Sequence, residues 1–150
     1  YWRDVIMYRR TDDRGLLAAM PAEDFLTEQF NAGTGWDKIA AAFMTASGDV
    51  SENGEAALFM AQMGETEDVT AEVSRIFLGI QISCAQCHDH PTDRWKRRQF
   101  HELAAFFPRT TVAPIRSDGK QIGFQVLSID REPRFARPGV AADVKNAAVK

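Results

Sequence analysis

Hydrophobic residues recur every three to four positions through most of the first 107 residues of the chain. Trp36, Ile39, Ala40 and Phe43 are the clearest example, because they follow the i, i+3, i+4, i+7 spacing of an amphipathic helix. Glycine, asparagine and proline residues interrupt the pattern where helices are expected to end. The pattern predicts helices over residues 2–9, 21–30, 36–47, 55–63, 67–84 and 94–107.

The last two predicted helices have continuous apolar faces. Thr66 is placed to cap the first of them, and acidic residues follow in its first turn, where the helix dipole favours negative charge. Asp93 is placed to cap the second, and Pro108 stops it. The predicted inner faces comprise Val69, Val73, Ile76, Phe77, Ile80 and Cys84 on the first helix, and Phe100, Leu103, Ala104 and Phe107 on the second.

The chain changes character after these helices. Residues 110–116 and 121–129 are rich in β-prone side chains, and Asp118-Gly119 between them is typical of a hairpin turn. Residues 131–139 contain prolines and arginines in a pattern that indicates an extended linker or tail.

These elements predict a mainly α fold with about five to six helices and a small C-terminal β-hairpin. We expect residues 1–110 to form a helical domain. Residues 111–150, with the hairpin and the tail, would belong to the same domain or lead to further domains.

Composition limits the classes of function. Hydrophobic residues make up 45% and charged residues 26% of the 150 residues, which is ordinary for one globular domain. The net charge of −3 argues against general nucleic-acid binding. Polar residues interrupt the longest apolar stretch, over residues 73–84, so no transmembrane segment is predicted.

The only two cysteines lie together in the sequence Cys84-Ala85-Gln86-Cys87-His88. This C-x-x-C-H pattern is typical of the attachment site of a c-type haem. The thiols of Cys84 and Cys87 would add to the two haem vinyl groups as thioethers, and His88 would bind the iron as the proximal ligand. The motif therefore predicts one covalently attached haem c.

Three other interpretations of the motif compete with haem attachment. A thioredoxin-like redox pair would need a strand before the motif, whereas a helix is predicted there. A zinc site would have to use Cys84, Cys87, His88 and His90, which lie within seven residues, whereas zinc ligands usually come in two pairs separated by a long loop. The third interpretation is an inert buried pair of cysteines beside a chance histidine.

The sequence leaves the sixth iron ligand open. No methionine follows His88, although small electron-transfer cytochromes c carry one downstream of the motif. His101 on the following helix is the first candidate, Met60 or Met63 one helix upstream is the second, and a vacant or water-filled position is the third. His90 is tethered too closely to His88 to reach the opposite face of the iron.

Side chains on both sides of the motif could surround the haem. The apolar candidates, each of which also fits ordinary core packing, are Phe77, Ile80, Trp95 and Phe100. Four cations gather where a helix is predicted to start and where its dipole disfavours positive charge: Arg94, Lys96, Arg97 and Arg98. Haem propionates or solvent would each account for them.

Several short motifs coincide in this region. They are Phe77-Leu78-Gly79, then Cys84-Ala85-Gln86-Cys87-His88-Asp89-His90-Pro91, then Asp93, and finally Ala105-Phe106-Phe107. Together they resemble a planctomycete-type cytochrome-like domain of unknown function, which occurs in large exported bacterial proteins. The resemblance extends over about residues 1–110.

The resemblance implies haem attachment at Cys84 and Cys87 and iron ligation by His88. It marks His90 and Asp93 as motif positions without a known role. Members of the family are several hundred residues long, so we expect the chain to be part of a longer polypeptide or complex.

We therefore expect a mono-haem c-type cytochrome domain that carries electrons, is not itself an enzyme, and has unidentified redox partner proteins. Thioether attachment is completed outside the cytoplasm in bacteria, so a periplasmic or otherwise exported location is expected. The alternatives are a haem enzyme or a gas or redox sensor with a vacant distal site, and a structural haem module of a larger assembly.

Overall fold

The computed structural model describes residues 1–129, which form two compact units. The first unit comprises Tyr1–Gly64 and Thr110–Ser128, and the second comprises Glu65–Arg109 together with Ile129. The predicted tail over residues 131–139 lies outside the described residues. The expected division into domains near residue 110 stays a prediction.

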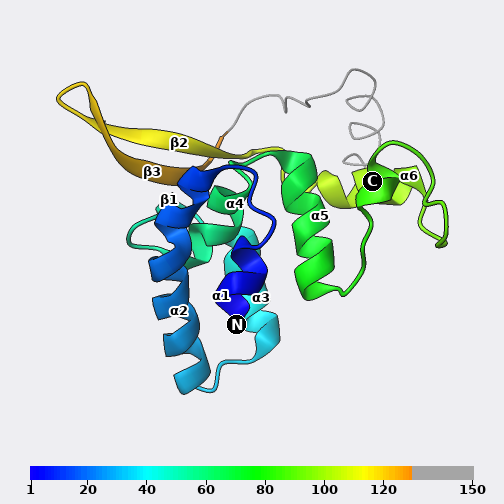
Figure 1. Cartoon of the computed structure of the whole chain (residues 1–150), viewed down its shortest axis with the longest axis horizontal. Coiled ribbons are helices and arrows are strands. Elements are labelled where there is room, and N and C mark those ends of the chain that lie inside the picture. Colours follow the sequence, from blue (N-terminus) through cyan, green and yellow to red (C-terminus); the bar gives the residue numbers. More distant parts are fainter. Residues whose placement is uncertain (130–150) are drawn as a thin grey trace. The chain divides into compact units, whose positions relative to one another are not determined.

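Residues 1–129 contain six α-helices and a three-stranded antiparallel sheet (Figure 1). The predicted mainly α fold with a C-terminal hairpin is confirmed. Among the same residues, none of the helices combines the length and the apolar character that a bilayer crossing requires.

The helices of the first unit surround a short central helix, α4. All five residues of α4 are buried, and α4 packs against helices and strands of its own unit. The predicted helix over residues 55–63 is found as a 3₁₀-helix, η2, followed by α4. The helical elements are α1 (Trp2–Met7), η1 (Asp13–Ala18), α2 (Ala19–Asn31), α3 (Trp36–Thr45), η2 (Gly54–Ala56) and α4 (Ala57–Ala61).

The sheet of the first unit is built on the predicted hairpin. Strands β2 (Thr110–Ser117) and β3 (Lys120–Ser128) pair antiparallel through the two-residue turn Asp118-Gly119 (Figure 1). Asp118 and Gly119 have φ of 50° and 75°, as a hairpin turn that matches the twist of the strands requires. A short strand that the sequence did not predict, β1 (Gly48–Asp49), pairs with the other edge of β3.

The second unit contains α5 (Thr66–Phe77), a 3₁₀-helix η3 (Ser83–Gln86), and α6 (Arg97–Ala104). The predicted helix over residues 67–84 is therefore wrong beyond Phe77. Gly79 has φ of 67°, a left-handed conformation that ends helices. The carbonyl of Ser74 accepts the N–H groups of Leu78 and Ile80, both at 3.1 Å, which turns the chain away from the helix axis.

The predicted starts of both helices also need correction. Thr66 is the first residue of α5 and Glu65 occupies the N-cap position, so the predicted cap is wrong. The helix predicted over residues 94–107 spans only Arg97–Ala104. Lys96 is its N-cap residue, and the backbone N–H of Lys96 donates to the Gln99 side chain at 2.9 Å.

Each helical element of the second unit buries apolar side chains. Val69, Val73 and Ile76 are buried on α5, as the predicted face of this helix required. The turn of η3 and the helix α6 meet in a buried cluster made of Ile82, Ala85, Phe100 and Ala104.

Candidate functional site

The two cysteines are displayed on either side of a buried alanine. Ala85 is fully buried, whereas the side chains of Cys84 and Cys87 are exposed. The amide of Ala85 donates to the carbonyl of Ile82 at 2.8 Å, which fixes the turn. The exposure of both thiols contradicts the interpretation of the pair as buried, and it makes both residues accessible to a reagent from solvent.

The ring of His88 is oriented by the backbone of the next residue. Its Nδ1 lies 2.7 Å from the carbonyl oxygen of Asp89. Because a carbonyl oxygen can only accept, Nδ1 carries the proton and Nε2 of the neutral ring keeps its lone pair. Metal-binding histidines commonly donate their other ring N–H in this way. The His88 side chain is exposed, so its Nε2 is accessible as a ligand.

The side chain of Asp89 connects the motif to the first turn of α6. One carboxylate oxygen accepts the backbone N–H of Arg97 at 3.0 Å, and the other accepts the ammonium of Lys96 at 3.0 Å. The N–H of Arg97 is one of the helix-start donors that have no partner inside the helix. These donors, the Arg97 N–H first and Lys96 second, hold the pKa of Asp89 below its usual value.

The family-motif residues His90 and Asp93 have local contacts in the loop. The backbone N–H of His90 donates to the carbonyl of Trp95 at 2.8 Å, and the Nδ1 of His90 accepts the N–H of Thr92 at 3.3 Å. The Asp93 carboxylate accepts the N–H of the adjacent Arg94 at 2.6 Å and does not cap α6. His90 therefore shapes the loop, and its Nδ1 has the opposite hydrogen-bonding role to that of His88.

Three of the four predicted haem-contact residues line one cavity in the second unit. This cavity has a volume of about 120 Å³. Its lining comprises Ser74, Leu78, Ile80, Ile82, Trp95, Gln99, Phe100 and Leu103. Phe77, the fourth predicted contact residue, is not in this lining, although Ser74 before it and Leu78 after it are.

The candidates for the sixth ligand fall into different units. His101 lies in the second unit on α6, where it is buried and makes an edge-to-face contact with Phe100 at a centroid distance of 5.4 Å. Met60 is fully buried in α4 of the first unit, and Met63 follows it in a turn with φ of 50°. His101 thus shares the compact unit of His88, whereas the two methionines do not, and the choice among them stays a prediction.

Protein groups account for much of the cation cluster near the motif. Helix α6 begins at Arg97. The other two cations, Arg94 and Lys96, therefore precede the helix and its dipole. Lys96 contacts Asp89, and the Arg98 guanidinium lies 3.4 Å from Glu102. The Arg94 guanidinium lies over the ring of Trp95, 5.2 Å from its centroid. These contacts explain why the cations gather here without requiring haem propionates.

The structure gives no support to the two rival metal or redox interpretations. Over residues 1–129, no group of three or more His, Cys, Asp or Glu side chains is arranged to hold a metal ion, which disfavours the zinc site. The motif follows α5 and a short connecting segment instead of a strand, so the thioredoxin arrangement is absent from this part of the chain.

A comparison with protein families gives a match to PSCyt2, described as a protein of unknown function (DUF1549), over residues 1–112. The chain belongs to the PSCyt2 family. The match agrees in extent with the resemblance expected over about residues 1–110. No curated protein and no solved structure matches the chain.

The PSCyt2 match covers the whole motif region. It includes every described residue of the second unit except Ile129, and it ends within β2 of the first unit. The motif, the loop after it and the cavity therefore all lie inside the family domain. The family name is cytochrome-like, and the description assigns no activity.

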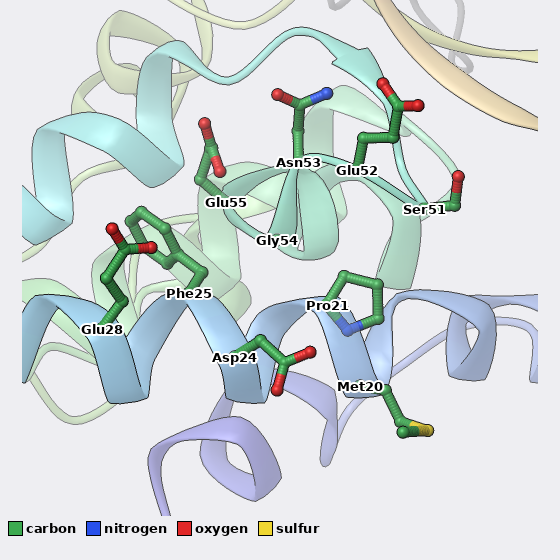
Figure 2. Close-up of a pocket in the computed structure, with 10 residues that line it drawn as sticks. All are labelled: Met20, Pro21, Asp24, Phe25, Glu28, Ser51, Glu52, Asn53, Gly54 and Glu55. Carbon is green, nitrogen blue, oxygen red and sulfur yellow. The ribbon is translucent and has the colours of Figure 1, made fainter.

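The PSCyt2 domain also contains a groove that the sequence analysis did not identify. This open groove in the first unit has a volume of about 560 Å³, and four carboxylates line it without any lysine or arginine from the described residues. Figure 2 shows two of these carboxylates on α2 and two on the segment around η2. The sequence contained one signal for this groove, the spacing of the carboxylates, which is four residues on α2 and three residues near η2. The lining comprises Met20, Pro21, Asp24, Phe25, Glu28, Ser51, Glu52, Asn53, Gly54 and Glu55.

Proposed function

We propose that this chain is a haem c domain that carries electrons. In this proposal one haem is attached through thioethers to Cys84 and Cys87, and the Nε2 of His88 binds its iron. The observation that carries the proposal is the His88 ring, whose Nδ1–H donates to the Asp89 carbonyl beside two exposed thiols.

The donor set fits this group. Thioether formation needs two accessible thiols separated by two residues, and both Cys84 and Cys87 are exposed on one turn. An axial imidazole needs a free ring nitrogen, and the hydrogen bond to Asp89 leaves the Nε2 of His88 in that state. The same hydrogen bond makes the imidazole a more basic ligand. When bound, the haem supplies a one-electron redox centre.

The cavity beside the motif supplies an apolar wall. Pockets that enclose a drug-sized ligand have volumes of roughly 300–1,000 Å³, whereas this cavity has about 120 Å³. It is therefore too small to enclose a porphyrin. Ile80, Trp95 and Phe100 would contact part of the haem and exclude water from that side.

Electron transfer is the function that an exposed motif supports best. Cys84, Cys87 and His88 are all exposed, so a haem attached to them would lie where a partner protein can approach it. We propose a periplasmic or otherwise exported location, because haem c attachment is completed outside the cytoplasm. The redox partners would be proteins, and the domain would act within a longer polypeptide or a complex.

The attachment is tested by producing the full chain in a bacterial host that matures c-type haem. The denatured protein should retain one haem by mass and give a pyridine haemochrome spectrum. The Cys84→Ser/Cys87→Ser double variant should lose it, and Thr92→Ser serves as a matched loop control that retains it. The proposal is overturned if a control cytochrome made in the same host acquires its haem while the wild-type chain keeps both thiols unmodified.

Electron transfer is tested on the same material. The haem should cycle reversibly between ferric and ferrous states, remain low-spin in both, and take up carbon monoxide slowly. Rapid carbon monoxide binding by a high-spin ferrous form would contradict the electron-carrier function and favour a sensor or enzyme with a vacant distal site. A haem that cannot be reduced in the folded protein would favour a structural module.

A further inference from the structure

The segment that carries His88 is attached to α6 on both sides. On the N-terminal side, Ala85 packs in the buried cluster with Phe100 and Ala104 of α6. On the C-terminal side, the Asp89 carboxylate accepts the backbone N–H of Arg97, the first residue of α6. His88 lies between these two attachments, so the same helix constrains the chain before and after it.

The attachment through Asp89 is the more specific of the two. Its carboxylate meets an N–H at a helix start, where an unpaired donor and the positive end of the helix dipole both favour an anion. The same carboxylate also contacts the Lys96 ammonium at 3.0 Å. Hydrogen bonds that involve a charged group are roughly twice as strong as neutral ones.

The backbone of Asp89 makes the contact to the candidate ligand. Its carbonyl oxygen accepts the Nδ1–H of His88, while its side chain holds the N-terminus of α6. Fixing the Asp89 side chain restricts the peptide group that orients the His88 ring.

We propose that Asp89 is a positioning residue, which fixes the orientation and the tautomer of His88 by attaching the motif loop (residues 87–96) to α6. This inference rests on the proposed haem attachment. It assigns a role to a residue that follows the C-x-x-C-H motif and that the motif itself does not include. The role requires a side chain that accepts the Arg97 N–H, and negative charge strengthens it.

Three variants separate this role from the general effect of losing an acidic residue in the loop. They are Asp89→Ala, Asp89→Asn and Asp93→Ala. Asp89→Ala removes both side-chain contacts. Asp89→Asn keeps an oxygen that can accept the Arg97 N–H but removes the charge. Asp93→Ala is the matched control, because the Asp93 carboxylate accepts the N–H of its neighbour Arg94 and does not cap α6.

Two measurements are made on the full chain. Each variant is compared with the wild type in the same form, either with haem or without it, and mass spectrometry verifies that form. The first is hydrogen exchange at the Arg97 amide, which Asp89→Ala should accelerate by tenfold or more, on the order expected for losing a hydrogen bond to a charged group. The second is the midpoint potential of the haem. Asp89→Ala should raise it, because a less firmly held Nδ1–H makes His88 a less basic ligand. Asp89→Asn should fall between the wild type and Asp89→Ala in both.

The outcomes distinguish the two proposals. If the wild type carries no haem, the proposed function fails, and the exchange measurement still reports whether Asp89 attaches the loop to α6. If the wild type carries haem while Asp89→Ala matches Asp93→Ala in both measurements, the positioning role is overturned and haem attachment stands. If exchange accelerates while the potential stays at the wild-type value, Asp89 has only a structural role and the proposal is also overturned.

Discussion

Ala85, which lies between the two cysteines, packs in the same buried cluster as Phe100 of α6. The alanine has no exposed surface and Phe100 has almost none. This contact turns Cys84 and Cys87 outward, because Ala85, one of the two residues between them, is directed into the core. The presentation of the thiols therefore depends on a small side chain at position 85.

Enlarging this side chain should disturb both stability and haem attachment. Ala85→Leu adds three carbon atoms to a packed cluster, and such overpacking typically costs roughly 1–3 kcal/mol of the free energy of unfolding. Urea unfolding measures this cost, and mass spectrometry of material matured in parallel measures the attached haem. Gln86→Leu is the matched control, because Gln86 is half-buried and lies outside the cluster. Equal losses in the two variants would contradict the role of Ala85.

Replacing the proposed proximal ligand should separate attachment from ligation. In His88→Ala the thioethers at Cys84 and Cys87 can still form, so the chain that matures should keep its haem mass. The low-spin absorption spectrum should disappear, and added imidazole should restore it by occupying the vacated position.

His90→Ala is the control for this prediction. The Nδ1 of His90 accepts a backbone N–H within the loop, so this ring is already engaged locally. Its variant should keep the low-spin spectrum without imidazole. The opposite pattern, with spectral loss in His90→Ala and none in His88→Ala, would show that His90 binds the iron and that the assignment to His88 is wrong.

A pH-dependent contact is expected in the first unit, at the start of η1. The Arg14 guanidinium and the Arg14 backbone N–H both donate to Asp12 and lower its pKa to about 2. Because the folded-state pKa lies below the unfolded value, this contribution to stability is present above about pH 4 and is lost as the pH falls toward 2. Carbon-13 NMR titration of the Asp12 carboxyl should give a midpoint near 2 in the wild type, and Arg14→Gln should raise it. A wild-type midpoint at the ordinary value of 3.8 would contradict the contact.

Sequence patterns predicted the features that depend on neighbouring residues. The hairpin is the clearest example, because Asp118 and Gly119 adopt the positive φ values of its turn and the strands on either side of them pair. The apolar face of α5 was also predicted, since Val69 and Val73 are buried at helical spacing. The C-x-x-C-H motif identified the cysteines and the histidine that the structure places together on an exposed turn.

The features that were missed depend on one glycine in a left-handed conformation or on distant partners. Apolar periodicity continues past Phe77, so only the left-handed conformation of Gly79 reveals where α5 ends. The contact of Asp89 with the Arg97 N–H spans eight positions and has no local pattern. Strand β1 forms because Gly48 pairs with Val126, a partner far away in the sequence.

Because η2 approaches α2 closely, Gly54 has less room for a side chain than the other glycines described in the first unit. A Cβ atom at this position would lie 2.0 Å from the carbonyl oxygen of Pro21 and 2.7 Å from the Cβ of Phe25. Backbone atoms cannot move aside cheaply, so Gly54→Ala should lower the free energy of unfolding by roughly 1–3 kcal/mol, the usual cost of overpacking. Gly123→Ala in β3 is the control, because its Cβ would meet only the Ile115 side chain, at 3.7 Å. Alanine should be tolerated there or raise stability by up to about 1 kcal/mol, since glycine weakens a strand. Urea unfolding followed by circular dichroism measures both variants, and a Gly54→Ala chain as stable as Gly123→Ala would show that α2 and η2 do not pack this closely.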